Sequence, residues 1–132
     1  MTRPDVDNAE AISQLVDAFY ARVLTDPTLA PVFTEVARVD LDHHLPTIKA
    51  FWRKMLLGHR DYQRNMVARH AAVHARFGLH PRHFDRWLTL FTQTVDAGFA
   101  GPGADRLKAL ATSIAGNLEN NLDSYVQRMA LD

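Results

Sequence analysis

The chain has 132 residues, which suffice for one domain with a buried core but not for two, so we expect a single domain over residues 1–132. Its 15 Lys and Arg balance 15 Asp and Glu, and this net charge of 0 does not favour nucleic acid or an anionic membrane as a partner. The absence of cysteine excludes disulfides and thiolate metal sites. No signal-peptide core or membrane-spanning run is present, so a cytoplasmic location is expected.

The first predicted helix covers residues 8–24. Asp7 and Glu10 have the spacing of a capping box at its N-terminus. Tyr20 lies on the apolar face, so we expect its hydroxyl near the interior, where it needs a hydrogen-bond partner. The other members of that face follow the i, i+3, i+4 pattern and are Ile12, Leu15, Val16, Phe19 and Val23.

The second predicted helix runs from about Pro46 to Leu57, with His44 at its start. Proline disfavours helical dihedrals at the residue before it and lacks a backbone donor. We therefore expect His44 at a kink or a helix start, where its imidazole can swing. The apolar face that His44 shares comprises Ile48, Phe51, Trp52 and Met55.

Two further helices are predicted after an irregular stretch from 59 to 80, which holds a short helical run near 66–75. Gly78 ends that run and Pro81 suits a first helical turn, so a helix is expected over 81–99. The last helix covers about 104–130. No segment alternates like a strand, so the fold class is all-α. The expected buried faces are Phe84, Trp87, Leu88 and Phe91, then Leu107, Leu110, Ala111, Ile114, Leu118, Leu122, Tyr125 and Met129.

His74 lies at the end of the short run, just before the aromatic face of the 81–99 helix. One nitrogen ligand beside a wide apolar wall is what a flat cofactor with a central metal requires. Tyr20, His44 and Trp87 each add one polar group to an apolar face, and their donors suit a small diatomic ligand. The residues therefore favour a cofactor site that binds such a ligand.

Four parts of the sequence share their order and spacing with a known family. They are Ala18 to Val23 with Asp26-Pro27; His44-Leu45-Pro46 with Phe51-Trp52 and Leu56-Leu57-Gly58; Asp61-Tyr62; and His74 through His83-Phe84-Asp85-Arg86-Trp87-Leu88-Thr89-Leu90-Phe91. Together they span about residues 12 to 95 and resemble the truncated haemoglobins, in particular the third group of that family. The resemblance implies a shortened globin fold, a two-over-two helical sandwich that encloses a haem. Its helix pairs would be 8–24 with 44–57, and 81–99 with 104–130.

The resemblance also implies roles for single residues. Tyr20 and Trp87 match positions that hydrogen-bond the bound ligand, and His44 matches a distal gate. The positions that match haem-packing residues are Phe19, Phe33, Ile48, Phe51 and Trp52. We expect further cofactor contacts from Tyr62, Arg76, Phe77, Phe84 and Trp87, and an arginine could pair with a haem propionate.

Two histidines compete for the iron. His74 matches the proximal ligand because it keeps the family's 13-residue interval to Trp87, and it is flanked by apolar side chains. His70 keeps the usual spacing from Tyr62 and remains the alternative. They stand four residues apart on one face, about 6 Å along a helix axis, so only one can lie under the iron.

Other readings of these histidines find less support. An i, i+4 pair such as His70 and His74 could bind zinc, but the glutamate of a zinc protease motif is missing between them. A di-iron bundle needs inward-facing carboxylates, whereas the inward faces are apolar. A cofactor-free helical interaction module, whose aromatic faces simply pack together, stays open. The other histidines (His43, His59, His80 and His83) are expected at the surface or as caps.

The resemblance implies haem b as the cofactor and reversible binding or transport of dioxygen and related diatomics. It leaves open nitric oxide dioxygenase or peroxidase-like activity, with a reductase as partner. We expect a monomer or a weak homodimer.

Overall fold

The computed structural model describes residues 3–33, 41–60, 70–72, 74–75 and 78–131, and the side chains of these residues except 41–43 and 124–131. It contains the helices α1 (Ala9–Val23), α2 (Leu41–Leu57), α4 (Pro81–Gly98) and α5 (Pro102–Leu131). The described part holds no strand, which confirms the all-α class. None of its helices combines the length and the apolar character that a membrane span needs.

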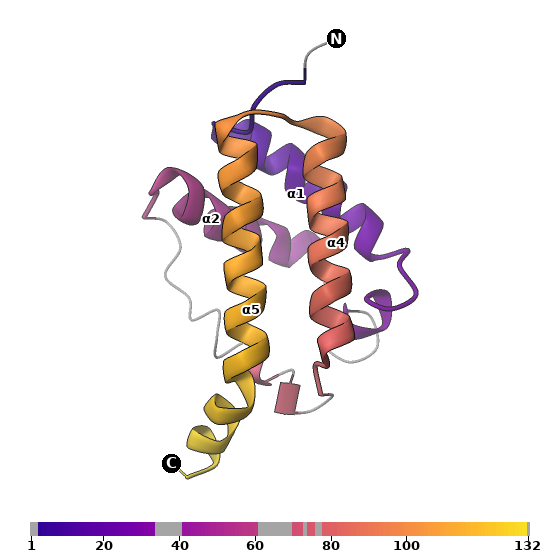
Figure 1. Cartoon of the computed structure of the whole chain (residues 1–132), viewed down its shortest axis with the longest axis vertical. Helices are drawn as coiled ribbons and strands as arrows, with labels where there is room; N and C mark the ends of the chain where they lie inside the picture. Colours follow the sequence, from indigo (N-terminus) through magenta and orange to yellow (C-terminus); the bar gives the residue numbers. More distant parts are fainter. Residues whose placement is uncertain (1–2, 34–40, 61–69, 73, 76–77, 132) are drawn as a thin grey trace.

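The four helices form two layers (Figure 1). Helices α4 and α5 run antiparallel along the long axis and are joined by a short turn, while α1 and α2 cross behind them. Helix α4 packs on α5 and α1, and α2 packs on α1 and α5. This arrangement confirms the predicted two-over-two sandwich and places one end of α4 beside both α1 and the chain that follows it.

Helix α1 begins one residue later than predicted, and a different residue caps it. The side-chain oxygen of Asn8 accepts a hydrogen bond of 2.8 Å from the N–H of Ala11. Asp7 instead accepts from the side-chain amide of Asn8, so the predicted capping box of Asp7 and Glu10 is wrong. Asn and Asp are about equally favourable at the N-cap, and here Asn8, the residue nearer the helix, is the N-cap.

Helix α2 begins at Leu41, earlier than predicted, and Pro46 lies inside it. A proline there removes one helical hydrogen bond but its fixed φ is compatible with a helix. His44 consequently lies in the first turn of α2, so its expected place at a helix start is confirmed, while the predicted start of the helix at about Pro46 is wrong. Helix α4 begins at Pro81 as predicted.

The N-terminal segment is docked onto the turn between α4 and α5. The carboxylate of Asp5 accepts hydrogen bonds of 2.9 Å and 2.8 Å from the N–H groups of Gly103 and Ala104. The first of these bonds is the largest cause that lowers the pKa of Asp5, and the carboxylate also complements the positive end of the α5 dipole. A Cβ at Gly103 would lie 2.4 Å from the carbonyl oxygen of Val6, so this close approach requires glycine.

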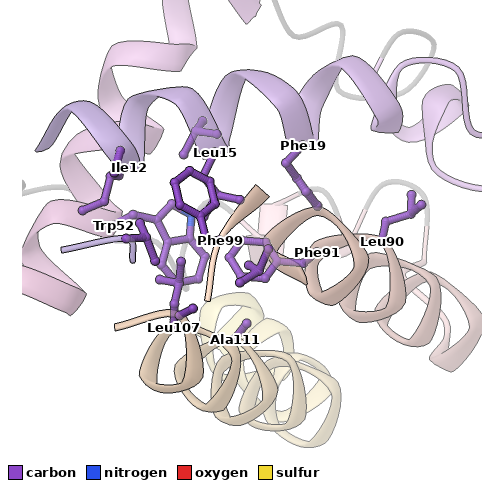
Figure 2. Close-up of a cluster of buried hydrophobic side chains, with 14 of the residues drawn as sticks. Ile12, Leu15, Phe19, Trp52, Leu90, Phe91, Phe99, Leu107 and Ala111 are labelled. Atoms are coloured by element: carbon purple, nitrogen blue, oxygen red, sulfur yellow. The ribbon is translucent and has the colours of Figure 1, made fainter. Parts of the chain in front are cut away.

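The main core lies between the two layers (Figure 2). Trp52 from α2 and Phe91 from α4 lie with α1 on one side of them and Leu107 of α5 on the other. Its fully buried members include Ile12, Leu15, Val16, Phe19, Val23, Phe91, Val95, Leu107 and Ala111. A second, smaller cluster joins Ala71 to Phe84, Leu118 and Leu122. The predicted faces of α1, α4 and α5 are confirmed, except Tyr125 and Met129, which lie outside the described side chains.

Candidate functional site

Half-buried apolar side chains from α1, α2, α4 and the chain after α1 pack on the main core without being fully enclosed. They include Tyr20, Phe33, Leu45, Ile48, Phe51, Met55, Trp87 and Leu88. We call this set the apolar wall. Four of the predicted haem contacts, Phe33, Ile48, Phe51 and Trp87, belong to the wall. Phe19 and Trp52 lie behind it in the core, with 1% and 6% of their surface exposed.

Aromatic rings connect the wall to the core across three elements. Phe19 makes edge-to-face contacts with Tyr20 and Trp87, with centroids 5.1 and 5.7 Å apart. Tyr20 contacts Phe33 in the same way at 5.7 Å. Trp87 stacks on Phe91 at 5.1 Å, and Phe91 stacks on Trp52 at 4.9 Å. Such pairs fix ring positions, so Tyr20 and Trp87 are held by packing rather than by their polar atoms.

The polar atoms of Tyr20 and Trp87 are available to bind a ligand. Both side chains make ring contacts, and within the described part of the chain neither the phenol O–H nor the indole N–H forms a hydrogen bond. Burial raises the pKa of Tyr20, so the phenol stays protonated and can act as a donor. No fully buried side-chain nitrogen or oxygen in the described part of the chain lacks a partner, so the phenol O–H and the indole N–H are free to donate to a ligand only where they reach the surface of the packed rings.

His44 lies in the first turn of α2, and its side chain is half-buried. Its neighbour Leu45 is a member of the apolar wall. The position is compatible with the predicted gate.

His74 lies elsewhere, at the end of the chain segment formed by residues 70–72 and 74–75. Its Nδ1 accepts a hydrogen bond of 2.9 Å from the N–H of Leu79, and its Nε2 lies 2.5 Å from Oδ1 of Asp123 on α5. Its carbonyl oxygen accepts a bond of 2.8 Å from the N–H of Gly78. Both ring nitrogens of the predicted iron ligand are thus engaged by the protein.

His70 begins the same segment and is half-buried. The residue after it, Ala71, is completely buried in the second cluster against α4 and α5. Figure 1 shows this segment between the lower ends of α4 and α5. The predicted contact Phe84 lies in the second cluster and is buried. The other predicted contacts, Tyr62, Arg76 and Phe77, lie outside the described residues.

The described residues contain no group of three or more His, Cys, Asp and Glu side chains that could hold a metal ion. A zinc or di-iron site built from protein ligands therefore has no support in that part of the chain. A metal held by one imidazole and a macrocycle has no such requirement.

Two side-chain partnerships were not predicted. Asp26 is buried and accepts hydrogen bonds from the N–H groups of Thr28 and Leu29 and from Nε of Arg86 at 2.7 Å. In the sequence, Asp26 before Pro27 indicated only the end of a helix. Asp123 meets His74 across 49 residues, a separation that leaves no local signal.

His83 was expected at the surface or as a cap, and only the second role is confirmed. It is 5% exposed, and its Nδ1 accepts a hydrogen bond of 2.9 Å from the N–H of His80, the N-cap residue of α4. The backbone N–H of the N-cap residue His80 is therefore bonded by the side chain of His83, one turn later.

Comparisons with known proteins agree with this architecture. A family model described as bacterial-like globin matches residues 5–119. The group 3 truncated hemoglobin ctb of Campylobacter jejuni is 27% identical over 121 residues, which cover 89% of this chain and 93% of that protein. A crystal structure of group III truncated hemoglobin from Campylobacter jejuni is similar with a TM-score of 0.77 and 28% identity, over 87% of this chain and 91% of the other. These similarities confirm the resemblance to the third group and the shortened globin fold.

Proposed function

Because the chain belongs to the bacterial-like globin family, we propose that it binds haem b against the apolar wall and, with it, dioxygen and related diatomic ligands. The observation that carries the proposal is the pair of donors, the Tyr20 hydroxyl and the Trp87 indole N–H, that have no hydrogen-bond partner in the described part of the chain. When bound, the haem supplies a redox-active iron with one open position for a diatomic ligand.

The residues present fit such a group. The apolar wall would exclude water from the ring faces, and Tyr20 and Trp87 would donate hydrogen bonds to a ligand with partial negative charge. His44 controls access from the first turn of α2. On the proximal side the iron ligand comes from the segment after residue 69, where His74 is the predicted ligand and His70 the alternative.

Haem titration of the purified haem-free chain tests the proposal. We expect a saturating Soret band at a single equivalent of haem. Phe33→Asp places a charge in the apolar wall and should weaken binding strongly, because an unpaired charge is costly there. Leu24→Asp is the control, since Leu24 follows directly after α1, is 42% exposed and should leave binding unchanged. No saturable band in the wild-type chain would instead support a cofactor-free helical module.

The type of haem follows from a property of the sequence. The chain has no cysteine, so a thioether attachment cannot form. Haem should therefore extract into acidified organic solvent, and haem that stays with the protein would exclude haem b.

One reaction distinguishes an enzyme from a protein that only binds ligands, namely turnover of nitric oxide in the presence of a reductant. We propose that a reductase returns the iron to its ferrous state in this reaction. A rate no faster than that of free haem would restrict the function to ligand binding. We further propose a cytoplasmic monomer or weak homodimer, which sedimentation of the haem-loaded protein tests.

A further inference from the structure

Asp26 is a buried carboxylate that is bonded through both of its oxygens. Its side chain is 3% exposed, and Oδ2 accepts hydrogen bonds of 3.1 Å from the N–H groups of Thr28 and Leu29. The other oxygen, Oδ1, accepts a bond of 2.7 Å from Nε of Arg86 on α4. Burying a charge is costly unless it is paired and hydrogen-bonded, and here three N–H donors meet that need. Asp26 therefore joins the chain after α1 to α4.

Each end of this pair lies close in the chain to one of the two proposed ligand donors. Tyr20 occupies the last turn of α1, and the N–H of Asp26 closes the chain that follows on the carbonyl of Val23 at 3.1 Å. On the other side, Arg86 directly precedes Trp87 in α4. Figure 1 shows the chain after α1 curling beside the lower half of α4. The pair thus links the two stretches of backbone that carry the phenol and the indole.

Ring packing and this ion pair act on the two donors in different ways. Phe19 makes edge-to-face contacts with the rings of Tyr20 and Trp87, so packing keeps the two rings close to each other. The burial of apolar surface is non-directional, however, and leaves small rotations of α4 possible. A hydrogen bond between charged groups depends on both distance and angle. The bond between Asp26 and Arg86 therefore restricts how α4 is rotated against the end of α1.

We propose that Asp26 and Arg86 form a clamp that sets the position of the Tyr20 hydroxyl relative to the Trp87 indole N–H, and thereby the strength of the hydrogen bonds that both give to a bound ligand. Asp26 and Arg86 are positioning residues, because the clamp acts on the ligand only through Tyr20 and Trp87. This inference rests on the proposed binding of haem and a diatomic ligand. It also gives a role to two residues of the stretches that resemble the globin family for which the sequence implied none.

The C–O stretching band of the ferrous carbon monoxide complex tests the clamp, because a donor at the ligand oxygen weakens the C–O bond and lowers its frequency. In the haem-loaded, full-length protein we expect Arg86→Ala to shift the band to higher frequency or to split it. Dioxygen should dissociate about two- to ten-fold faster, since the donors are displaced rather than removed. Arg86→Lys, which retains a cation, should lie between Arg86→Ala and wild type.

Asp26→Asn tests the same bond from its other end. It keeps the shape of the side chain but removes the charge, so it should change the band in the same direction as Arg86→Ala. Because both variants remove one interaction, the double variant should shift the band no further than the larger single change. Additive shifts would show that the two residues act separately. An unchanged band in both single variants would overturn the clamp, even if the free energy of unfolding fell.

Lys108→Ala is the matched control for a general loosening of the fold. It removes another bond of 2.7 Å between a partly exposed cation and an aspartate, Asp96, which lies near the opposite end of α4 from Arg86. We expect the band of Lys108→Ala to equal that of wild type. A shift as large as that of Arg86→Ala would attribute the effect to general loosening and contradict the clamp.

The failure of the clamp can be told apart from the failure of the proposed function. Tyr20→Phe removes a donor itself, so its band must move if the phenol reaches the ligand. A band that moves in Tyr20→Phe but in neither Arg86→Ala nor Asp26→Asn overturns the clamp alone. A wild-type chain that takes up no haem, or a band unchanged in both Tyr20→Phe and Trp87→Phe, contradicts the proposed function instead.

Discussion

The two sides of the proposed haem site are built in opposite ways. On the distal side, rings from α1, α2 and α4 hold each other by packing, and the donors of Tyr20 and Trp87 have no partner in the described part of the chain. On the proximal side, both ring nitrogens of His74 are bonded within the protein. A ligand could therefore accept from Tyr20 and Trp87 without breaking a hydrogen bond in the described part of the chain, whereas a metal bound by Nε2 of His74 would replace its contact with Asp123.

The largest effect is expected where packing dominates. Phe19 is 1% exposed and contacts the rings of Tyr20, Trp87 and Phe91. Phe19→Ala should lower the free energy of unfolding of the haem-free protein by about 3–5 kcal/mol. His74→Asn should cost under about 1.5 kcal/mol, since it loses hydrogen bonds near the surface. Urea denaturation measures both, and equal losses would break the comparison.

The next effect concerns the chain after α1. Asp26→Asn weakens bonds to Leu29 and Arg86 and should cost about 1–3 kcal/mol near neutral pH. Burial alone would raise the pKa of Asp26, but the hydrogen bond from Arg86, with that from Leu29, outweighs it and the pKa is lowered. Because the pKa is lower in the folded chain, ionised Asp26 stabilises the fold at pH values above its unfolded pKa of about 4. This stabilisation is lost as the pH falls through the folded pKa. The difference between wild type and variant should therefore shrink in acid, and a constant difference would contradict this.

A smaller pH effect is expected at the start of α4. Burial, followed by the charges of Arg82 and His80, lowers the pKa of His83. In the unfolded chain, His83 takes up a proton near pH 6.5, as an unperturbed histidine does, whereas in the folded chain it does so only at lower pH. The free energy of unfolding therefore falls as the pH drops through about 6. His83→Leu should remove this part of the pH dependence in thermal unfolding. A variant with the same slope as wild type would contradict the assignment.

The smallest effect is expected at the gate. His44→Leu should change the association rate of carbon monoxide or dioxygen by a larger factor than the dissociation rate, because His44 lies in the first turn of α2 next to Leu45 of the apolar wall. Flash photolysis and stopped flow measure the two rates. The reverse pattern would show that His44 bonds the ligand directly.

The spacing of apolar residues and the positions of proline and glycine were sufficient to predict most of the fold. The apolar faces of α1, α4 and α5 follow helical spacing, and Pro81 and Gly78 mark the boundary that the structure shows. The start of α2 could not be predicted, because a proline in an early turn is compatible with either a start or a continuation. The contact between His74 and Asp123 could not be predicted either, since these residues are 49 positions apart and meet only in the folded chain.

Dioxygen dissociation from the haem-loaded protein tests the central claim most directly, comparing wild type with Tyr20→Phe, Trp87→Phe and the double variant. Each hydrogen bond to a partly charged ligand is worth about 1.5–3 kcal/mol, so Tyr20→Phe should release dioxygen at least about ten-fold faster. If Trp87 compensates for the lost phenol, the double variant should show the acceleration. Unchanged dissociation in both Tyr20→Phe and the double variant would contradict the claim that these two donors serve the ligand.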